Sequence, residues 1–138
     1  TYQEKIVVES YILSHAKGMR PSTTLCLKID GEVIEEHAQG DGQFDAFMNA
    51  LAKIYKTKNL ELPKLIDYAV RIPPGSSSDA LCETIITWTN NGKEFKTRGL
   101  DSDQTVAAIV ATQKMLNVIP SPALSEGEKV KPKLEIQV

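Results

Sequence analysis

Two glycine-containing turns, each followed by a helical pattern, are where this sequence could bring backbone and side chains together for chemistry. The first reads Gly40-Asp-Gly-Gln-Phe-Asp45 and the second reads Gly99-Leu-Asp-Ser-Asp103. The start of a helix offers N–H groups without helical partners and the positive end of the helix dipole, so it can hold an anion such as a carboxylate. The alternative is that the glycines only form the turn, by taking positive φ.

Acidic side chains accompany both turns. Asp41 and Asp45 belong to the first, and Asp101 and Asp103 to the second. Capping explains one acid at each helix start, a role that we expect for Asp101 or Ser102 in the second turn. A further carboxylate suits a zwitterion, because helix N–H groups bind its carboxylate while an Asp accepts its ammonium group. Free amino acids are ligands of this kind.

An amino acid with an apolar side chain also needs a hydrophobic pocket. Four aromatic or branched residues near the turns in the expected fold can supply one, and each can equally be an ordinary core residue: Phe44, Leu65, Tyr68 and Ile72.

The cysteines and histidines do not form a recognisable catalytic or metal-binding pattern. Cys26 lies within a strand-like run, which favours a packed thiol over a nucleophile. His15 and His37 are isolated, and neither forms a metal-ligand spacing with Cys26 or Cys82. We therefore expect no catalytic residue, metal site or cofactor in this chain, and the low cysteine count fits a reducing, cytoplasmic location.

Composition excludes several classes of protein. The chain has 138 residues, 41% of them hydrophobic and 25% charged, which is typical of one folded domain. Its net charge of −2 lacks the basic excess of a nucleic-acid binder. Its apolar runs are far shorter than the ~20 residues that cross a membrane. Because Thr1 leads directly into a strand-like run, we expect a piece of a longer protein.

The order of elements repeats within the chain. Tyr11 and Tyr68 lie in strand-like runs 57 positions apart, and each run is followed by a hairpin, with turns at Asp30-Gly31 and at 90–92. Superposing the turn glycines pairs Leu25 with Ile86 and Leu27 with Trp88, so that one strand face is apolar in both halves.

A helical pattern closes each half, at 46–56 and 104–117. At an offset of 59 the apolar positions coincide, and the expected core positions are Phe47, Ala50, Leu51, Ile54 and Tyr55 in the first helix and Val106, Ile109 and Val110 in the second. These patterns predict an α+β fold of two pseudo-symmetric βββα units, with antiparallel sheets and helices on one face.

Residues 65–72 have two partly apolar faces, which predicts burial against a second copy of the chain, and hence a homodimer. We expect one domain over 1–119, followed by a linker-like tail over 120–138. Leu134, Ile136 and Val138 alternate in that tail and could add an edge strand.

Several of these motifs resemble, in order and spacing, the C-terminal regulatory domain of 2-isopropylmalate and citramalate synthases. They are Gly40 to Leu51, Leu65 to Val70, Gly75 with Asp79-Ala80, the hairpin at Gly92, and Arg98 to Thr105. The resemblance covers about residues 5–118. Family members usually have Pro-Val where this chain has Gln43-Phe44, which concerns the identity of the effector more than the fold.

The resemblance implies an allosteric, dimeric domain that binds an end-product branched-chain amino acid and carries no catalysis itself. Acetyl-CoA condensation would belong to a separate TIM-barrel domain. By position, the head group would lie near Gly40, Gly42, Asp45 and Ala46, with Asp45 as the ammonium acceptor. The implied side-chain pocket comprises Phe44, Leu65, Tyr68, Ile72 and Cys82, closed by the loop that contains Leu100, Asp101 and Gln104.

The Gln43-Phe44 pair favours the citramalate branch, and hence isoleucine over leucine. The alternatives are a leucine-binding domain of 2-isopropylmalate synthase, a purely structural dimerisation module, and a small enzyme with an unrecognised carboxylate pair. An amino-acid sensor of the ACT type would also bind such ligands, but its βαββαβ order differs from the order predicted here.

Overall fold

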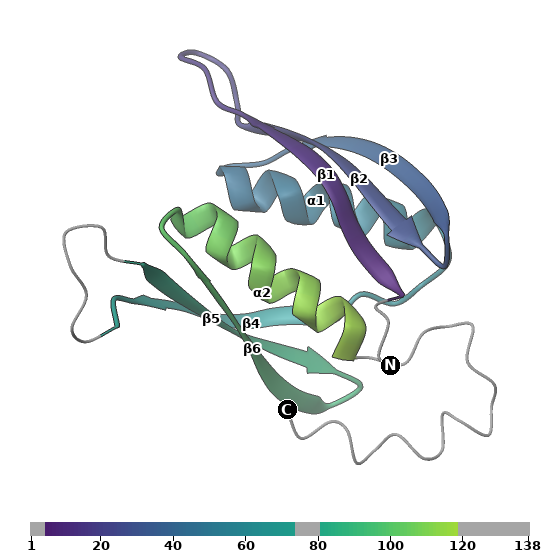
Figure 1. Cartoon of the computed structure of the whole chain (residues 1–138). Coiled ribbons are helices and arrows are strands. Elements are labelled where there is room, and N and C mark those ends of the chain that lie inside the picture. The colour runs from purple at the N-terminus through teal and green to yellow at the C-terminus, as the bar shows by residue number, and fades with distance from the viewer. Residues whose placement is uncertain (1–4, 74–80, 119–138) are drawn as a thin grey trace. The chain divides into compact units, whose positions relative to one another are not determined.

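The chain forms two compact units, residues 1–62 and 63–138, each a three-stranded antiparallel sheet with one helix packed against it (Figure 1). The computed structural model describes residues 5–73 and 81–118. In the first unit the elements are β1 (Ile6–Ser14), β2 (Ser22–Ile29), β3 (Glu32–Gln39) and α1 (Gln43–Thr57). In the second they are β4 (Lys64–Arg71), β5 (Cys82–Asn90), β6 (Lys93–Asp101) and α2 (Gln104–Val118). The predicted α+β fold of two βββα units is confirmed.

The two sheets repeat even in their irregularities. Strand orders are β1-β2-β3 and β4-β5-β6, and Tyr11 pairs with Leu25 as Tyr68 pairs with Ile86. A register shift interrupts the first strand pair of each unit, between Val8 and Ser10 and again between Leu65 and Asp67. The offset of 57 therefore relates β1 to β4, as predicted.

From the hairpin to the end of the helix the offset is 61. The hairpin turns at Asp30-Gly31 and Asn91-Gly92 all take positive φ, which their Asp-Gly and Asn-Gly sequences favour. The helices begin at Gln43 and Gln104, the same number of residues after those turns. The sequence-based offset of 59 for the helices is therefore wrong, because it rested on aligning Gly40 with Gly99.

The corrected offset changes the face of the second helix that enters the core. Val106 and Val110 are only half-buried, although Ile109 is buried as predicted. The buried face of α2 matches that of α1 position by position at an offset of 61, and it comprises Ala107, Ala108, Ala111, Thr112, Met115 and Leu116.

Glycine is needed at positions 40 and 99 because the backbone of the following helix lies very close, and not because the chain turns there. Neither takes positive φ. A β-carbon on Gly40 would lie 2.5 Å from the backbone nitrogen of Ala46, and one on Gly99 would lie 1.9 Å from the carbonyl oxygen of Ala107. Strand ends thus press directly against the helices, which fixes where each helix starts relative to its sheet.

A buried hydrogen-bond chain ties α2 to its sheet. The indole Nε1–H of Trp88 donates to Thr97 Oγ1 over 2.9 Å, and the Thr97 hydroxyl donates to the carbonyl oxygen of Ala111 over 2.7 Å. Trp88 is fully buried and Thr97 nearly so. One hydroxyl therefore satisfies both a buried donor on β5 and an acceptor on the helix.

Replacing Thr97 with valine is expected to lower the free energy of unfolding by about 1–3 kcal/mol, because it leaves the Trp88 N–H buried without an acceptor. Urea denaturation followed by the fluorescence of Trp88 measures this loss. Thr97→Ser keeps the hydroxyl and should lose clearly less. An unchanged stability in Thr97→Val would contradict a contribution from the hydrogen bonds, and an equal loss in Thr97→Ser would mean that the methyl group contributes as much as they do.

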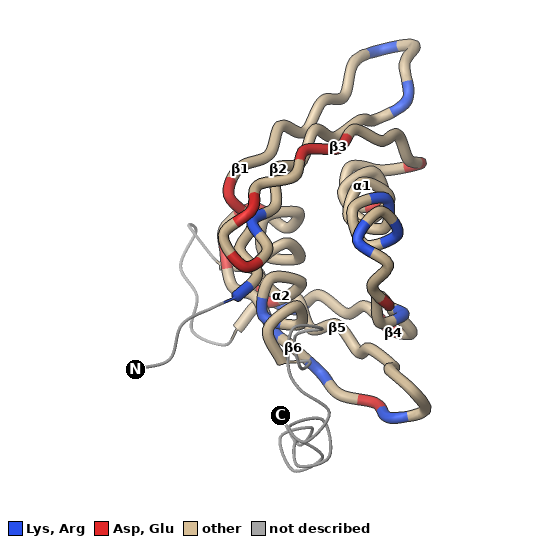
Figure 2. Tube along the Cα trace, turned by 90° about the vertical axis from the view of Figure 1, so that its right-hand side faces the viewer, with Lys and Arg blue, Asp and Glu red and all other residues tan. Residues whose placement is uncertain are grey.

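Neither described helix is long and apolar enough to cross a membrane. Acidic and basic residues occur along both units, as Figure 2 shows, in keeping with the small net charge of −2. Gly75, Asp79-Ala80 and the predicted tail strand at Leu134 to Val138 lie outside the described residues.

Candidate functional site

Helix α1 begins without a side chain to cap it. Its N-cap is Gly42, whose backbone is extended, with φ −141° and ψ 174°. The carbonyl oxygen of Gly42 accepts the first helical hydrogen bond from Ala46, over 2.9 Å. Gly42 has no side chain to accept hydrogen bonds from the N–H groups of the first turn, so these groups and the positive end of the helix dipole can attract an anion.

Helix α2 begins in the opposite way, capped by carboxylates. Asp103 Oδ1 accepts hydrogen bonds from the backbone N–H groups of Thr105 and Val106, over 2.8 and 3.1 Å. Asp101 Oδ2 in turn accepts from the N–H of Asp103 over 2.8 Å. The capping residue is therefore Asp103, not Asp101 or Ser102 as expected. Because the cap is itself anionic, the second turn disfavours a bound carboxylate.

The two acids of the first turn have different surroundings. Asp41 forms an ion pair with Arg20, with 3.1 Å between Oδ1 and the guanidinium nitrogen, and both side chains are largely exposed. Asp45 is exposed on the first turn of α1, and no described residue donates a hydrogen bond to its carboxylate. Its Oδ2 lies 3.9 Å from the point that a β-carbon on Gly42 would occupy. A free carboxylate thus stands beside the uncapped helix start.

Phe44 and Ala46 are held by packing within the first unit. The ring of Phe44 stacks on Phe47, with centroids 6.2 Å apart, and Phe47 meets Tyr11 edge-on at 6.0 Å. The side chain of Ala46 is fully buried. Phe44 is half-buried and can still offer part of its ring as an apolar surface, whereas Ala46 can only position its neighbours.

The remaining predicted residues lie in the second unit. Leu65 and Tyr68 are register partners of the buried Trp88 and Ile86, so they share the face of the sheet that bears α2. Because α2 packs mainly on β5 and β6, that face of β4 stays open and Leu65 is 38% exposed. Ile72 follows the end of β4 and is 62% exposed. Large apolar side chains are therefore available at β4.

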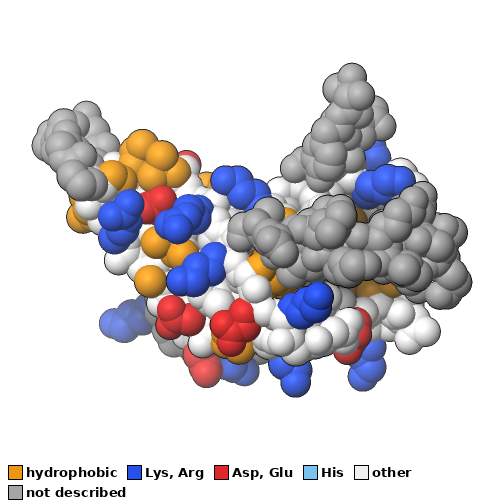
Figure 3. Space-filling model, turned by 90° about the horizontal axis from the view of Figure 1, so that it is seen from below, with side chains coloured by type: hydrophobic (Ala, Val, Ile, Leu, Met, Phe, Trp, Pro, Cys, Tyr) orange, Lys and Arg blue, Asp and Glu red, His pale blue; other side chains and the backbone are white. Residues whose placement is uncertain are grey.

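The other end of the second sheet brings two predicted residues together. Cys82 and Asp101 are register partners on β5 and β6, next to the exposed Gln104 at the start of α2. Leu100 belongs to β6 and not to a loop, and it is exposed. Hydrophobic side chains lie exposed between charged ones on the face drawn in Figure 3.

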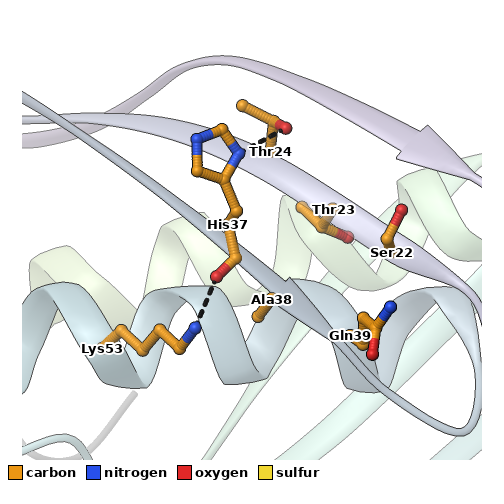
Figure 4. Close-up of a pocket in the computed structure, with 7 residues that line it drawn as sticks. All are labelled: Ser22, Thr23, Thr24, His37, Ala38, Gln39 and Lys53. Carbon is orange, nitrogen blue, oxygen red and sulfur yellow. Dashed lines mark hydrogen bonds between the residues drawn. The ribbon is translucent and has the colours of Figure 1, made fainter.

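A polar depression with a volume of ≈ 440 Å³ lies in the first unit, and none of the predicted site residues lines it. Its lining comes from β2, β3 and α1, and comprises Ser22, Thr23, Thr24, His37, Ala38, Gln39 and Lys53 (Figure 4). The His37 ring is held by Thr24 at 2.9 Å and by Glu35 at 3.3 Å. Sequence reasoning missed this feature, because its lining residues read as the ordinary alternation of two strands.

Among the described residues, no group of three or more His, Cys, Asp or Glu side chains is placed to hold a metal ion. Burial raises the pKa of the Tyr55 hydroxyl well above its ordinary value of 10, so that Tyr55 stays protonated in the core.

Comparison with known sequences shows the family to which the chain belongs. The sequence profile described as the LeuA allosteric (dimerisation) domain matches residues 1–119. The chain belongs to this family.

Several proteins of known name are similar to this LeuA-type domain. The 2-isopropylmalate synthase of Ruminiclostridium cellulolyticum is 27% identical over 83% of the chain and 22% of that protein. The putative (R)-citramalate synthase CimA of Archaeoglobus fulgidus is 28% identical over 85% of the chain and 23% of that protein. The 2-isopropylmalate synthase of Bacillus pumilus is 32% identical over 79% of the chain and 20% of that protein. The chain thus spans about a fifth of the length of these curated relatives.

The chain is therefore an allosteric domain of the 2-isopropylmalate synthase and citramalate synthase family. Within this LeuA-type domain, Gly40, Gly42, Asp45 and Ala46 gather at the start of α1. The predicted apolar group divides between Phe44 on α1 and residues of the second unit.

Proposed function

We propose that this domain binds a branched-chain amino acid at the start of α1 and thereby regulates a synthase of its family, of which it forms one part. The observation that carries the proposal is the contrast between the two helix starts. One is capped by glycine and stands beside the Asp45 carboxylate, which accepts no hydrogen bond from any described residue, whereas the other is filled by Asp103. Membership of an allosteric domain family supports a regulatory role.

The first turn can bind both ends of a zwitterionic head group. The effector's carboxylate would accept hydrogen bonds from N–H groups of the first turn of α1, assisted by the helix dipole. Its ammonium group would donate to Asp45. Phe44, Leu65, Tyr68, Ile72, Cys82 and the segment of Leu100, Asp101 and Gln104 remain the predicted contacts for its side chain.

The relatives favour leucine as the effector. Both enzyme names occur among the similar proteins, but 2-isopropylmalate synthase predominates. They do not support the preference for citramalate synthase and isoleucine that Gln43-Phe44 suggested. Because a single methyl position is worth only about 1–3 kcal/mol in a hydrophobic pocket, leucine, isoleucine and valine must be compared directly.

Regulation requires the effector to bind the less active arrangement of the enzyme more tightly, since equal affinity shifts no equilibrium. We propose that the domain acts as a homodimer attached to a catalytic TIM barrel. The exposed apolar residues of β4 support self-association, and they include Leu65, Ile66 and Val70. A purely structural dimerisation module is the alternative, and it predicts no response to amino acids.

Thermal denaturation with each of the three amino acids tests the proposal. At a hundredfold excess over Kd, binding should stabilise the fold by about 2.7 kcal/mol. Replacing Asp45 with alanine is expected to remove most of this stabilisation, because the ammonium group loses its acceptor. The fold itself should be little affected, since Asp45 is exposed.

Asp41→Ala is the matched control. It also removes one carboxylate from the turn, but that carboxylate is exposed and paired with Arg20, so the response to amino acids should persist. An unchanged response in Asp45→Ala would remove Asp45 from the head-group site. No response of the unaltered chain to any of the three amino acids would favour the structural module.

A further inference from the structure

Helix α1 closes the outer edge of its sheet with polar side chains. Strand β3 is an edge strand. Asn49 Nδ2 donates to the carbonyl oxygen of Gln39 over 2.8 Å, and Lys53 Nζ donates to that of His37 over 2.7 Å. The backbone acceptors that another strand would use are thus occupied.

Helix α2 leaves the equivalent edge open. At the offset of 61, Arg98 and Leu100 of β6 are equivalent to His37 and Gln39 of β3. The strand register confirms this equivalence, since Arg98 pairs with Ile85 just as His37 pairs with Thr24. The helix positions equivalent to Asn49 and Lys53 hold Val110 and the exposed Lys114. Within the described residues, no side chain of α2 bonds to the β6 carbonyls.

Apolar side chains overhang this open edge. Val106 and Val110 are half-buried, although their spacing predicts core positions. They occupy the side of α2 that corresponds to Asn49 and Lys53, the side from which α1 reaches the edge of β3. A fourth strand beside β6 would lie beneath them and complete their burial.

The opposite face of β6 carries two basic residues and one acidic residue. Lys96, Arg98 and Glu94 are exposed there, and Arg98 lies 3.7 Å from the carboxylate of Glu83, which also pairs with Arg71. A strand that fits this edge therefore needs apolar residues at alternate positions toward α2 and polar or acidic residues between them.

We propose that residues 134–138 of this chain, Leu-Glu-Ile-Gln-Val, pair with the edge of β6. Leu134, Ile136 and Val138 would face Val106 and Val110, and Glu135 would lie on the side of Lys96 and Arg98. The 15 residues 119–133 can span about 50 Å when extended, more than the ~30 Å length of a nine-residue strand. The segment lies beyond residues 1–119, which the family profile matches.

Amide hydrogen exchange, resolved by residue, tests the pairing. In the full chain the outward-pointing amides of Lys96 and Arg98 should exchange at least about tenfold more slowly than in a chain ending at Lys133. The amide of Thr97 points toward β5 and should be unchanged, which shows that the sheet stays folded. Equal rates at Lys96 and Arg98 in the two chains would overturn the proposal.

Two charge-matched variants test the predicted alternation. Ile136→Asp places a carboxylate under the apolar overhang, so the slow exchange should be lost. Gln137→Asp adds the same charge on the side of Lys96 and Arg98, where it should be tolerated. If both variants lose protection equally, or neither does, the alternation of faces is contradicted.

Val110→Asn gives α2 the residue that closes the edge in α1, and it should speed the exchange of the Lys96 amide by displacing the segment. Unchanged slow exchange in this variant would contradict the overhang as the binding surface. Protection that falls on dilution would mean that the strand comes from a second copy, which would overturn pairing within one chain.

Discussion

Replacing Gly99 with alanine is expected to destabilise the second unit by more than about 3 kcal/mol, enough to unfold a marginal domain. The added β-carbon would lie 1.9 Å from the carbonyl oxygen of Ala107 and 2.8 Å from the backbone nitrogen of Ala111. Both are backbone atoms of α2, so no side chain can rotate away. The helix must move off β6, which also separates Thr97 from Ala111.

Urea denaturation followed by tryptophan fluorescence measures this effect, because Trp88 is the only tryptophan of the chain and lies in the second unit. Gly42→Ala is the control, followed by circular dichroism. Its β-carbon would meet nothing nearer than Asp45 Oδ2 at 3.9 Å, and its φ of −141° suits any residue. The control should lose about 1 kcal/mol or less. A similarly small loss in Gly99→Ala would show that α2 can shift on its sheet without cost.

The fold was predictable because its signals are local. Asp30-Gly31 and Asn91-Gly92 specify tight hairpins, and the alternation through Leu25 and Leu27 marks the face that the helix covers. The repeat followed from these features. The face of α2 was partly mispredicted because Gly40 and Gly99 look alike in sequence, and only the structure shows that each meets its helix at a different point.

The candidate site was predictable only in part, for a related reason. Glycines and acids at a helix start are visible in a sequence, so both turns were found. Which acid caps and which stays free depends on backbone geometry, and this distinguishes Asp103 from Asp45. The two hydrogen bonds that close the edge of β3 join residues 10 and 16 positions apart, and in the described part of the chain α2 forms no such bonds with β6. The pattern of either helix alone does not reveal this difference.

Replacing Gly42 with aspartate is expected to abolish the stabilisation by amino acids, a loss of about 2.7 kcal/mol at a hundredfold excess over Kd, while leaving the fold intact. The extended backbone of Gly42 is the conformation of an N-cap residue, and aspartate there would accept from the first-turn N–H groups as Asp103 does in α2. Because glycine and aspartate differ as caps by only a few tenths of a kcal/mol, stability without ligand should hardly change.

Thermal denaturation with and without leucine, isoleucine and valine measures the loss. Gly42→Asn is the matched control, since its amide caps the same N–H groups without a negative charge. If an anionic head group binds there, asparagine should weaken the response by competing for the N–H groups, and aspartate should weaken it further by repelling the carboxylate. A full response in Gly42→Asp would place the effector's carboxylate elsewhere, because an aspartate at the N-cap would occupy the same first-turn N–H groups that the carboxylate of the ligand needs.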